Sequence, residues 1–303
     1  MNQLSPPSPN GRTSSRRVLV VGASGPTGGL VARAAARAGA IVRAIARTPQ
    51  AAERARAAGA TEVVPGDLRD PRSVQDALTG VDAAFYFSPR AVPDEAALGR
   101  AFITAAEHAG AGKVVVISML HAQAPIPNHQ QSLQVEEALA RTPLHSVVLR
   151  PAMFMQTLPP LERIAELGWV GRPYPADVPL AWVDLADMAQ VAVRALLEDT
   201  LDNGTFELCA PGMLTIADIA DLMSRALGRP IEAREITLEE WAQVRGEDFA
   251  SPYRRECYAE MFAYFRRHGF KGGNGLVLTH LLGRSPTTFA QYLRRSPAHV
   301  AAG

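Results

Sequence analysis

The sequence of 303 residues contains little cysteine, almost no lysine and no excess of charge of either sign. Its formal net charge of +1 gives neither the basic surface typical of nucleic-acid-binding proteins nor an acidic surface for a basic partner. The two cysteines, Cys209 and Cys257, lie far apart and match no metal-ligand spacing. We therefore expect no nucleic-acid partner, no metal site, and a reduced intracellular setting in which both thiols are small core residues.

Long apolar runs are absent as well. Arginines interrupt even the alanine-rich stretch 30–46, so the sequence predicts no membrane-spanning helix. Residues 1–16 are rich in Ser, Pro and Asn, and the apolar run that follows them is too short for the core of a signal peptide. We predict a disordered tail over 1–16 and a cytoplasmic protein.

Glycine is concentrated where the first apolar run ends. Residues 18–29 read VLVVGASGPTGG, which predicts a buried strand, a tight turn and the start of a helix. Glycines remove side chains where the backbone turns and approaches a ligand, and the following helix offers unpaired N–H groups to a pyrophosphate. A plain loop is the alternative interpretation. The predicted phosphate-binding residues are Gly22, Ser24, Gly25, Pro26, Thr27 and Gly28.

Strands and helices alternate through the first half of the chain. The predicted strands cover 18–21, 41–46, 61–65, 81–87, 113–118 and 145–150, and the predicted helices cover 30–40, 50–60, 70–78, 94–109 and 131–141. We expect Asp70 to cap its helix, with Pro71 at the first position. Because right-handed crossovers allow little else, this order predicts an α/β fold with a Rossmann-type, doubly wound parallel sheet.

The pattern changes after Pro159, where Gly, Pro, Trp and Tyr cluster over 168–175. We predict a dinucleotide-binding domain over 17–156 and a smaller C-terminal α/β region over 157–303 that binds the substrate and caps the cleft. Its expected helices are 184–197, 215–227, one around Trp241, 253–268 and a closing segment 286–295, with strands 205–209 and 231–236. Residues 184–210 are expected to return to the first domain.

In open α/β sheets the ligand binds outside the carboxyl ends of the strands, where the strand order reverses. This rule gives a second set of predicted cofactor-binding residues: Arg47, Asp67, Leu68, Phe87, Ser88, Pro89, Ser118, Met119, Pro151, Ala152, Met153 and Phe154.

The second predicted strand ends in a cation rather than an acid. An acid at this place commonly binds the ribose 2′-hydroxyl of NAD, whereas the 2′-phosphate of NADP calls for a positive charge. Residues 41–47 offer Arg43 and Arg47. We therefore predict that NADP(H) is preferred over NAD(H), the alternative being a solvated arginine at a strand end. Asp67 is expected to bind the adenine amino group, although Asp is also common in turns.

Several of these motifs together resemble the NmrA-like family, a group of atypical, extended-type short-chain dehydrogenase/reductases. The similar segments are 22–28, 42–47, 66–68, 149–151 and 183–187. The resemblance runs from about Arg17 to Leu293 and is looser after Gly168. It implies a Rossmann domain, a small C-terminal substrate domain and a bound NADP(H) or NAD(H). The family contains quinone and ketone reductases, isoflavone-type reductases and proteins that bind a dinucleotide as a regulatory signal.

The scarcity of lysine bears on the chemistry. Ordinary short-chain reductases protonate the developing alkoxide from a Tyr whose pKa is lowered by a Lys four residues later. Neither Lys113 nor Lys271 has a Tyr four positions before it, and Lys113 begins a strand at the end opposite the cleft. The sequence therefore excludes that pair and departs from family members that use a lysine here.

Other proton sources are few. His121 and His129 are the histidines expected near the nicotinamide, and with Ser118 they are the candidate catalytic residues. An exposed or merely hydrogen-bonded loop histidine is the alternative interpretation. A second route needs no protein acid, because a phenol of the substrate or a water molecule can polarise the carbonyl.

A stripe of large apolar residues gives a signal on the substrate. Tyr258, Met261, Phe262 and Phe265 have helical spacing, which is typical of a core or dimer face. The alternative is that they form, together with Trp241, Trp169 and Phe154, the wall of an apolar pocket for a flat aromatic compound. We expect a monomer or homodimer.

Together these features predict an NADP(H)-dependent oxidoreductase, for example a ketoreductase, that reduces a carbonyl, quinone or enone of a hydrophobic small molecule. The first alternative is a non-catalytic sensor that binds NADP(H) and passes its redox state to a protein partner. The absence of the Tyr–Lys pair keeps this alternative open. A third possibility is an isomerase or cyclase that holds the nucleotide as a structural part.

Overall fold

The centre of the molecule is a parallel sheet of seven strands, seen in a computed structural model that describes residues 15–295. Most of the predicted tail over 1–16 lies outside these residues. The strands are β1 (Arg17–Val20), β2 (Ile41–Ala46), β3 (Glu62–Pro65), β4 (Ala83–Phe87), β5 (Lys113–Ile117), β6 (His145–Pro151) and β10 (Gly204–Leu208). Their spatial order is β10-β6-β5-β4-β1-β2-β3, and every neighbouring pair is parallel. The chain therefore reverses its direction of winding between β1 and β4, and the predicted doubly wound fold is confirmed.

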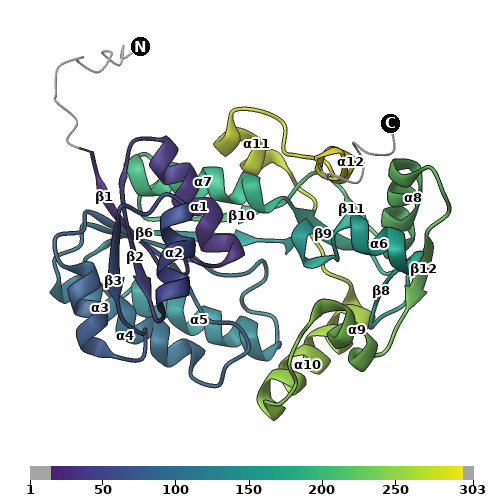
Figure 1. Cartoon of the computed structure of the whole chain (residues 1–303), viewed down its shortest axis with the longest axis horizontal. Helices are drawn as coiled ribbons and strands as arrows, with labels where there is room; N and C mark the ends of the chain where they lie inside the picture. The colour runs from purple at the N-terminus through teal and green to yellow at the C-terminus, as the bar shows by residue number, and fades with distance from the viewer. Residues whose placement is uncertain (1–14, 296–303) are drawn as a thin grey trace.

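Helices cover both faces of this sheet (Figure 1). One face packs α1 (Pro26–Arg37), α2 (Pro49–Ala57) and α7 (Leu185–Leu197), and the other packs α3 (Pro71–Leu78), α4 (Glu95–His108) and α5 (Pro127–Leu139). Successive side chains of a strand point to opposite faces. Accordingly Val18 and Val20 belong to the first core, whereas Leu19 and Val21 belong to the second.

Two helices begin earlier than their apolar periodicity predicts. α1 starts at Pro26 instead of Leu30, and α5 starts at Pro127 instead of Gln131. Proline is favoured at the first helical position, because its fixed φ suits the helix and its missing N–H would have no partner there. The expected cap of α3 is confirmed, since the Asp70 side chain accepts a hydrogen bond from the Arg72 backbone N–H.

The C-terminal part adds short elements beside the sheet (Figure 1). Three strands, β7 (Met153–Phe154), β9 (Leu180–Val183) and β11 (Met213–Leu214), form one small sheet, and β8 (Trp169–Arg172) pairs in parallel with β12 (Glu232–Glu235). The helical elements are η1 (Met155–Thr157), α6 (Leu161–Leu167), α8 (Ile216–Leu227), α9 (Leu238–Arg245), α10 (Pro252–His268), α11 (Leu276–Leu282) and α12 (Phe289–Arg294). α10 contacts α5, so the C-terminal part closes over the carboxyl ends of the central strands.

The path of α7 and β10 ties the two parts together. β10 pairs with β6 at the edge of the central sheet, and α7 packs against β4, β5 and β6. None of the helices in residues 15–295 is both long enough and apolar enough to cross a bilayer.

Candidate functional site

The glycine-rich turn after β1 has the geometry of a phosphate cradle. Gly22 has a φ of +73°, in the left-handed region that favours glycine. A Cβ on Gly28 would lie 2.4 Å from the carbonyl carbon and oxygen of Gly22, so no larger residue fits without a shift of the backbone. Gly25 caps α1 without any side-chain hydrogen bond. The turn thus leaves the N-terminus of α1 open to an anionic ligand, as a bound dinucleotide pyrophosphate requires.

Two side chains predicted to bind the nucleotide meet beside this turn. Arg47, after β2, has 70% of its side chain exposed, and its Nη1 lies 3.8 Å from Oδ2 of Asp67. Arg43, the arginine within β2, is not available to a ligand. Arg43 is held by the carboxylate of Glu62 and by two backbone carbonyls at the C-terminal end of α3, those of Ala77 and Thr79. Arg47 is therefore the cation that remains for a phosphate at the end of β2.

Residues from the ends of β4, β5 and β6 line a cavity of about 260 Å³. The predicted cofactor-binding residues in its wall are Phe87, Ser118, Met119, Pro151, Ala152, Met153 and Phe154. The rest of the prediction, namely the glycine turn, Arg47, Asp67, Leu68, Ser88 and Pro89, lies outside the cavity wall. The structure thus separates the predicted site into a nucleotide end and a cavity end.

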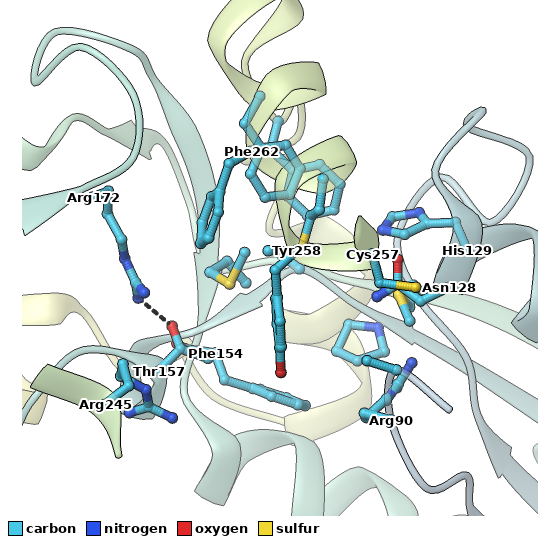
Figure 2. A pocket seen from close by; sticks show the side chains of 18 of the residues that line it. Arg90, Asn128, His129, Phe154, Thr157, Arg172, Arg245, Cys257, Tyr258 and Phe262 are labelled. Carbon is cyan, nitrogen blue, oxygen red and sulfur yellow. Dashed lines mark hydrogen bonds between the residues drawn. The ribbon is translucent and has the colours of Figure 1, made fainter. Parts of the chain in front are cut away.

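The opposite wall of the cavity comes from the C-terminal part. The apolar stripe of α10 lies here, as its alternative interpretation requires. Tyr258, Met261, Phe262 and Phe265 all line the cavity, together with Cys257 of the same helix and Trp241 of α9. The Trp241 ring centroid lies 4.8 Å from that of Tyr258 and 5.0 Å from that of Phe262. Trp169 does not join them, because it packs against the guanidinium of Arg234 instead. Aromatic side chains such as Phe154, Tyr258 and Phe262 thus form part of the lining (Figure 2).

A buried ion pair stands at the sheet side of the cavity. Arg90 follows β4, and its guanidinium lies over the ring of Phe87 at 4.7 Å and donates to the backbone oxygen of Ser118 at 3.4 Å. Its Nη1 lies 3.7 Å from Oε1 of Glu95, whose side chain is fully buried. Burial raises the pKa of Glu95 to about 7, and the charge of Arg90 opposes this shift. Ala91, next to Arg90, has a strained φ of +52°.

Sequence reasoning missed both partners of this pair. Arg90 lies two residues beyond Ser88 in the loop that leaves β4, so its place at the carboxyl edge of the sheet was the available signal. Nothing in the sequence pattern distinguishes Glu95 from a solvated acid in the first turn of a helix.

The three candidate catalytic residues have different surroundings. The His129 side chain lines the cavity, is 2% exposed, and has its Nδ1 at 2.9 Å from the backbone oxygen of His121. Because a carbonyl only accepts, Nδ1 carries the proton and Nε2 of the neutral ring accepts. Burial lowers the pKa of His129 to about 4. His121 is not in the cavity wall, and its Nε2 lies 2.7 Å from the oxygen of Lys271. The hydroxyl of Ser118 is buried without a hydrogen-bond partner among the described residues.

No lysine lines the cavity. Lys113, at the start of β5, is buried and binds the backbone oxygen of Glu198 and the carboxylates of Asp199 and Asp202. Within residues 15–295 no group of three or more His, Cys, Asp or Glu side chains has the geometry to hold a metal ion.

Comparison with known proteins finds relatives that cover nearly the whole chain. The sequence model of the NmrA-like family matches residues 14–293 of this chain. The NAD(P)H azoreductase of Xenophilus azovorans is 31% identical over 294 residues, which cover 94% of this chain and 98% of that protein.

Two solved structures share the fold. The NADPH-dependent quinone oxidoreductase QOR2 of Escherichia coli, complexed with NADPH, has a TM-score of 0.76 at 22% identity and covers 91% of this chain and 98% of its own. The triphenylmethane reductase of Citrobacter sp., complexed with NADP(H), has a TM-score of 0.79 at 22% identity, with coverages of 92% and 99%.

Proposed function

The chain belongs to the NmrA-like family, and we propose that it is an NADP(H)-dependent reductase of a carbonyl, quinone or enone group in an aromatic small molecule. The observation that carries the proposal is the aromatic cavity at the ends of β4, β5 and β6, on the same sheet edge as the glycine turn. A flat apolar compound suits this lining. The similarity of this chain to an NAD(P)H azoreductase supports reduction as the reaction type.

The residues present fit the dinucleotide. The glycine turn and the open N-terminus of α1 would hold the pyrophosphate, and Arg47 the 2′-phosphate, while Asp67 would bind the adenine. The segments 87–89, 118–119 and 151–154 would position the nicotinamide. When bound, NADPH supplies a hydride.

The chain's own contribution would be to stabilise negative charge on the substrate oxygen. Arg90 is a cation in the cavity wall that packs on Phe87 and has 24% of its side chain exposed, so its charge acts more strongly there than at the open surface. The unpartnered hydroxyl of Ser118 lies in the same wall and can donate a hydrogen bond to the same oxygen. Arg90 would thus perform the electrostatic part of the task that a lysine performs in ordinary short-chain reductases.

Histidine would not be the acid at neutral pH. The low pKa of His129 leaves its ring neutral, with Nε2 as an acceptor, so we assign it the orientation of a water or a substrate hydroxyl. His121 holds the loop to Lys271 rather than reaching the cavity. Water then delivers the last proton. Turnover should be unchanged in His121→Ala and reduced but not abolished in His129→Ala, which loses only the orientation of the water. Abolished turnover in either variant would contradict this route.

The test is the loss of NADPH absorbance with a panel of naphthoquinones, aromatic ketones and azo dyes, with NADPH affinity measured in parallel. We expect turnover on at least one class. Tight NADPH binding with no turnover on any class would overturn the reductase proposal in favour of the regulatory sensor.

A further inference from the structure

Two arginines meet at the end of the cavity away from Arg90. Arg172 ends β8 and Arg245 ends α9, and both line the cavity next to Thr157. Figure 2 shows these three side chains on one side of Phe154 and Tyr258, and Arg90 and His129 on the other. The Arg172 side chain is only 3% exposed, and its Nη2 donates to Oγ1 of Thr157 at 2.8 Å.

Neither guanidinium forms an ion pair with a carboxylate of residues 15–295. Nε of Arg245 is buried and has no hydrogen-bond partner within the described part of the chain, while its Nη1 reaches only the Gln156 backbone oxygen, at 3.5 Å. The acid that lines the same cavity, Glu247, pairs with Arg254 at 3.8 Å. Two neighbouring positive charges therefore remain without a compensating negative charge.

This arrangement is costly in the free protein. A buried charge is normally paired, because the loss of hydration is otherwise not offset. Burial lowers the pKa of Arg172 to about 10, and the charge of Arg245 adds to the shift, yet Arg172 stays cationic at neutral pH. An anion between the two guanidiniums would supply the missing charge and accept several N–H donors in the fork geometry that suits carboxylate, sulfonate and phosphate.

We propose that Arg172 and Arg245 form a subsite for an anionic group of the substrate, a carboxylate, sulfonate or phosphate. Thr157, whose hydroxyl accepts from Arg172 and donates to the Phe154 backbone oxygen at 2.7 Å, holds Arg172 in position. The proposal rests on the proposed function in one respect, that the same cavity holds the substrate. The aromatic body would lie between Phe154 and Tyr258, with the reducible group at the Arg90 end and the anion at the other. The substrate is then an amphiphilic aromatic anion rather than a neutral apolar compound.

Equilibrium binding tests the subsite without turnover. Naphthalene-2-sulfonate and its neutral analogue naphthalene-2-sulfonamide are titrated calorimetrically into the full chain with saturating NADP⁺ at pH 7. We expect the sulfonate to bind at least about tenfold more tightly, since its hydrogen bonds to guanidinium are charge-assisted. Arg172→Gln and Arg245→Gln should remove most of this preference. Arg255→Gln should keep it, because Arg255 is an exposed residue of α10 paired with Glu239.

Variants of Arg245 and Arg90 distinguish the possible outcomes of this experiment. Arg245 is only partly buried, so Arg245→Gln decides the matter if Arg172→Gln does not fold. Equal affinities for sulfonate and sulfonamide, or a preference unchanged in Arg245→Gln, would overturn the proposal. So would a preference lost in Arg90→Gln but kept in Arg172→Gln, because the anion would then bind at the other end. A selective sulfonate site in a protein that reduces nothing would leave the subsite standing and the reductase function refuted.

Discussion

The two ends of the cleft are built in different ways. The nucleotide end is made of backbone from one continuous stretch, with an exposed arginine, Arg47, beside it. The cavity end is made of side chains that are far apart in the sequence. Of its arginines, Arg172 is buried and Arg90 and Arg245 are partly buried. We therefore expect the shape of the backbone to decide nucleotide binding at the first end. At the cavity end we expect charge to decide substrate binding. Water is scarce there, so electrostatic interactions are stronger and an unpaired polar group lowers the stability more than it would at the surface.

The largest effect is expected from a single methyl group at the nucleotide end. In Gly28→Ala the new Cβ would meet Gly22 backbone atoms at 2.4 Å, so the turn has to open and its N–H groups lose their common direction. NADPH affinity should fall about 100-fold or more, as two or more charge-assisted hydrogen bonds are lost. Fluorescence titration with NADPH measures the dissociation constant of the variant and of the wild type.

Gly39→Ala is the matched control. Gly39 also has a positive φ, of +86°, but an added Cβ would meet nothing within 4 Å. This variant should lose about 1 kcal/mol of stability through backbone strain and keep its NADPH affinity. Similar NADPH affinities in the two variants would contradict the close approach at Gly28.

At the cavity end, the largest effect is expected from Arg90. Arg90→Gln should lower kcat about 100-fold, the usual cost of losing one group that stabilises an oxyanion, while NADPH affinity stays within about twofold. Arg100→Gln serves as control, because Arg100 is exposed on α4 and its guanidinium donates to the side chain of Gln134, away from the cavity wall. A fall in NADPH affinity that accounts for the lost activity would place Arg90 at the nucleotide end instead.

The contrast also explains what the sequence could predict. Local patterns were sufficient for the sheet: the predicted strands over 41–46 and 113–118 agree with β2 and β5 to within one residue. Strands β7, β8, β9 and β11 were not predicted. β7 and β11 have only two residues each, which are too few to show a period, and β8 lies in the cluster of Gly, Pro, Trp and Tyr over 168–175. The glycine turn was recognisable because it is a local backbone motif.

The cavity end was only partly recognisable. The α10 stripe was visible as helical spacing, since Tyr258, Phe262 and Phe265 lie on one face. Arg90, Glu95 and Arg172 gave no comparable signal, because their importance comes from burial and from neighbours that only the fold brings together. A sequence rich in arginine does not show which of its arginines are buried without an acid.

Glu95 gives the cavity end a pH dependence of stability. The pKa of Glu95 in the folded protein is about 7, above its ordinary value of 4.5, so protonation of this carboxyl stabilises the folded state. The stabilisation that protonation of Glu95 gives is complete below pH 4.5 and is lost as the pH rises through 7. Glu95→Gln keeps the uncharged form at every pH. Its free energy of unfolding relative to the wild type should therefore increase by roughly 3 kcal/mol between pH 4.5 and pH 8, measured by urea unfolding.

Glu107→Gln is the control on the same helix, because Glu107 is exposed. Its stability relative to the wild type should hardly change over that pH range. A flat difference for Glu95→Gln as well would mean that Glu95 stays charged beside Arg90 throughout.

The smallest effect is expected at the exposed arginine of the nucleotide end. Arg47→Ala should weaken NADPH binding by roughly 1.5–3 kcal/mol, the cost of charge-assisted hydrogen bonds to the 2′-phosphate, and should leave NADH binding nearly unchanged. The effect should shrink as salt is added, because Arg47 is 70% exposed and screened by counterions. Arg54→Ala, on α2, is a control that should alter neither affinity. Equal weakening of NADPH and NADH in Arg47→Ala would show that Arg47 does not select the phosphate, and that cofactor choice is made elsewhere in the cleft.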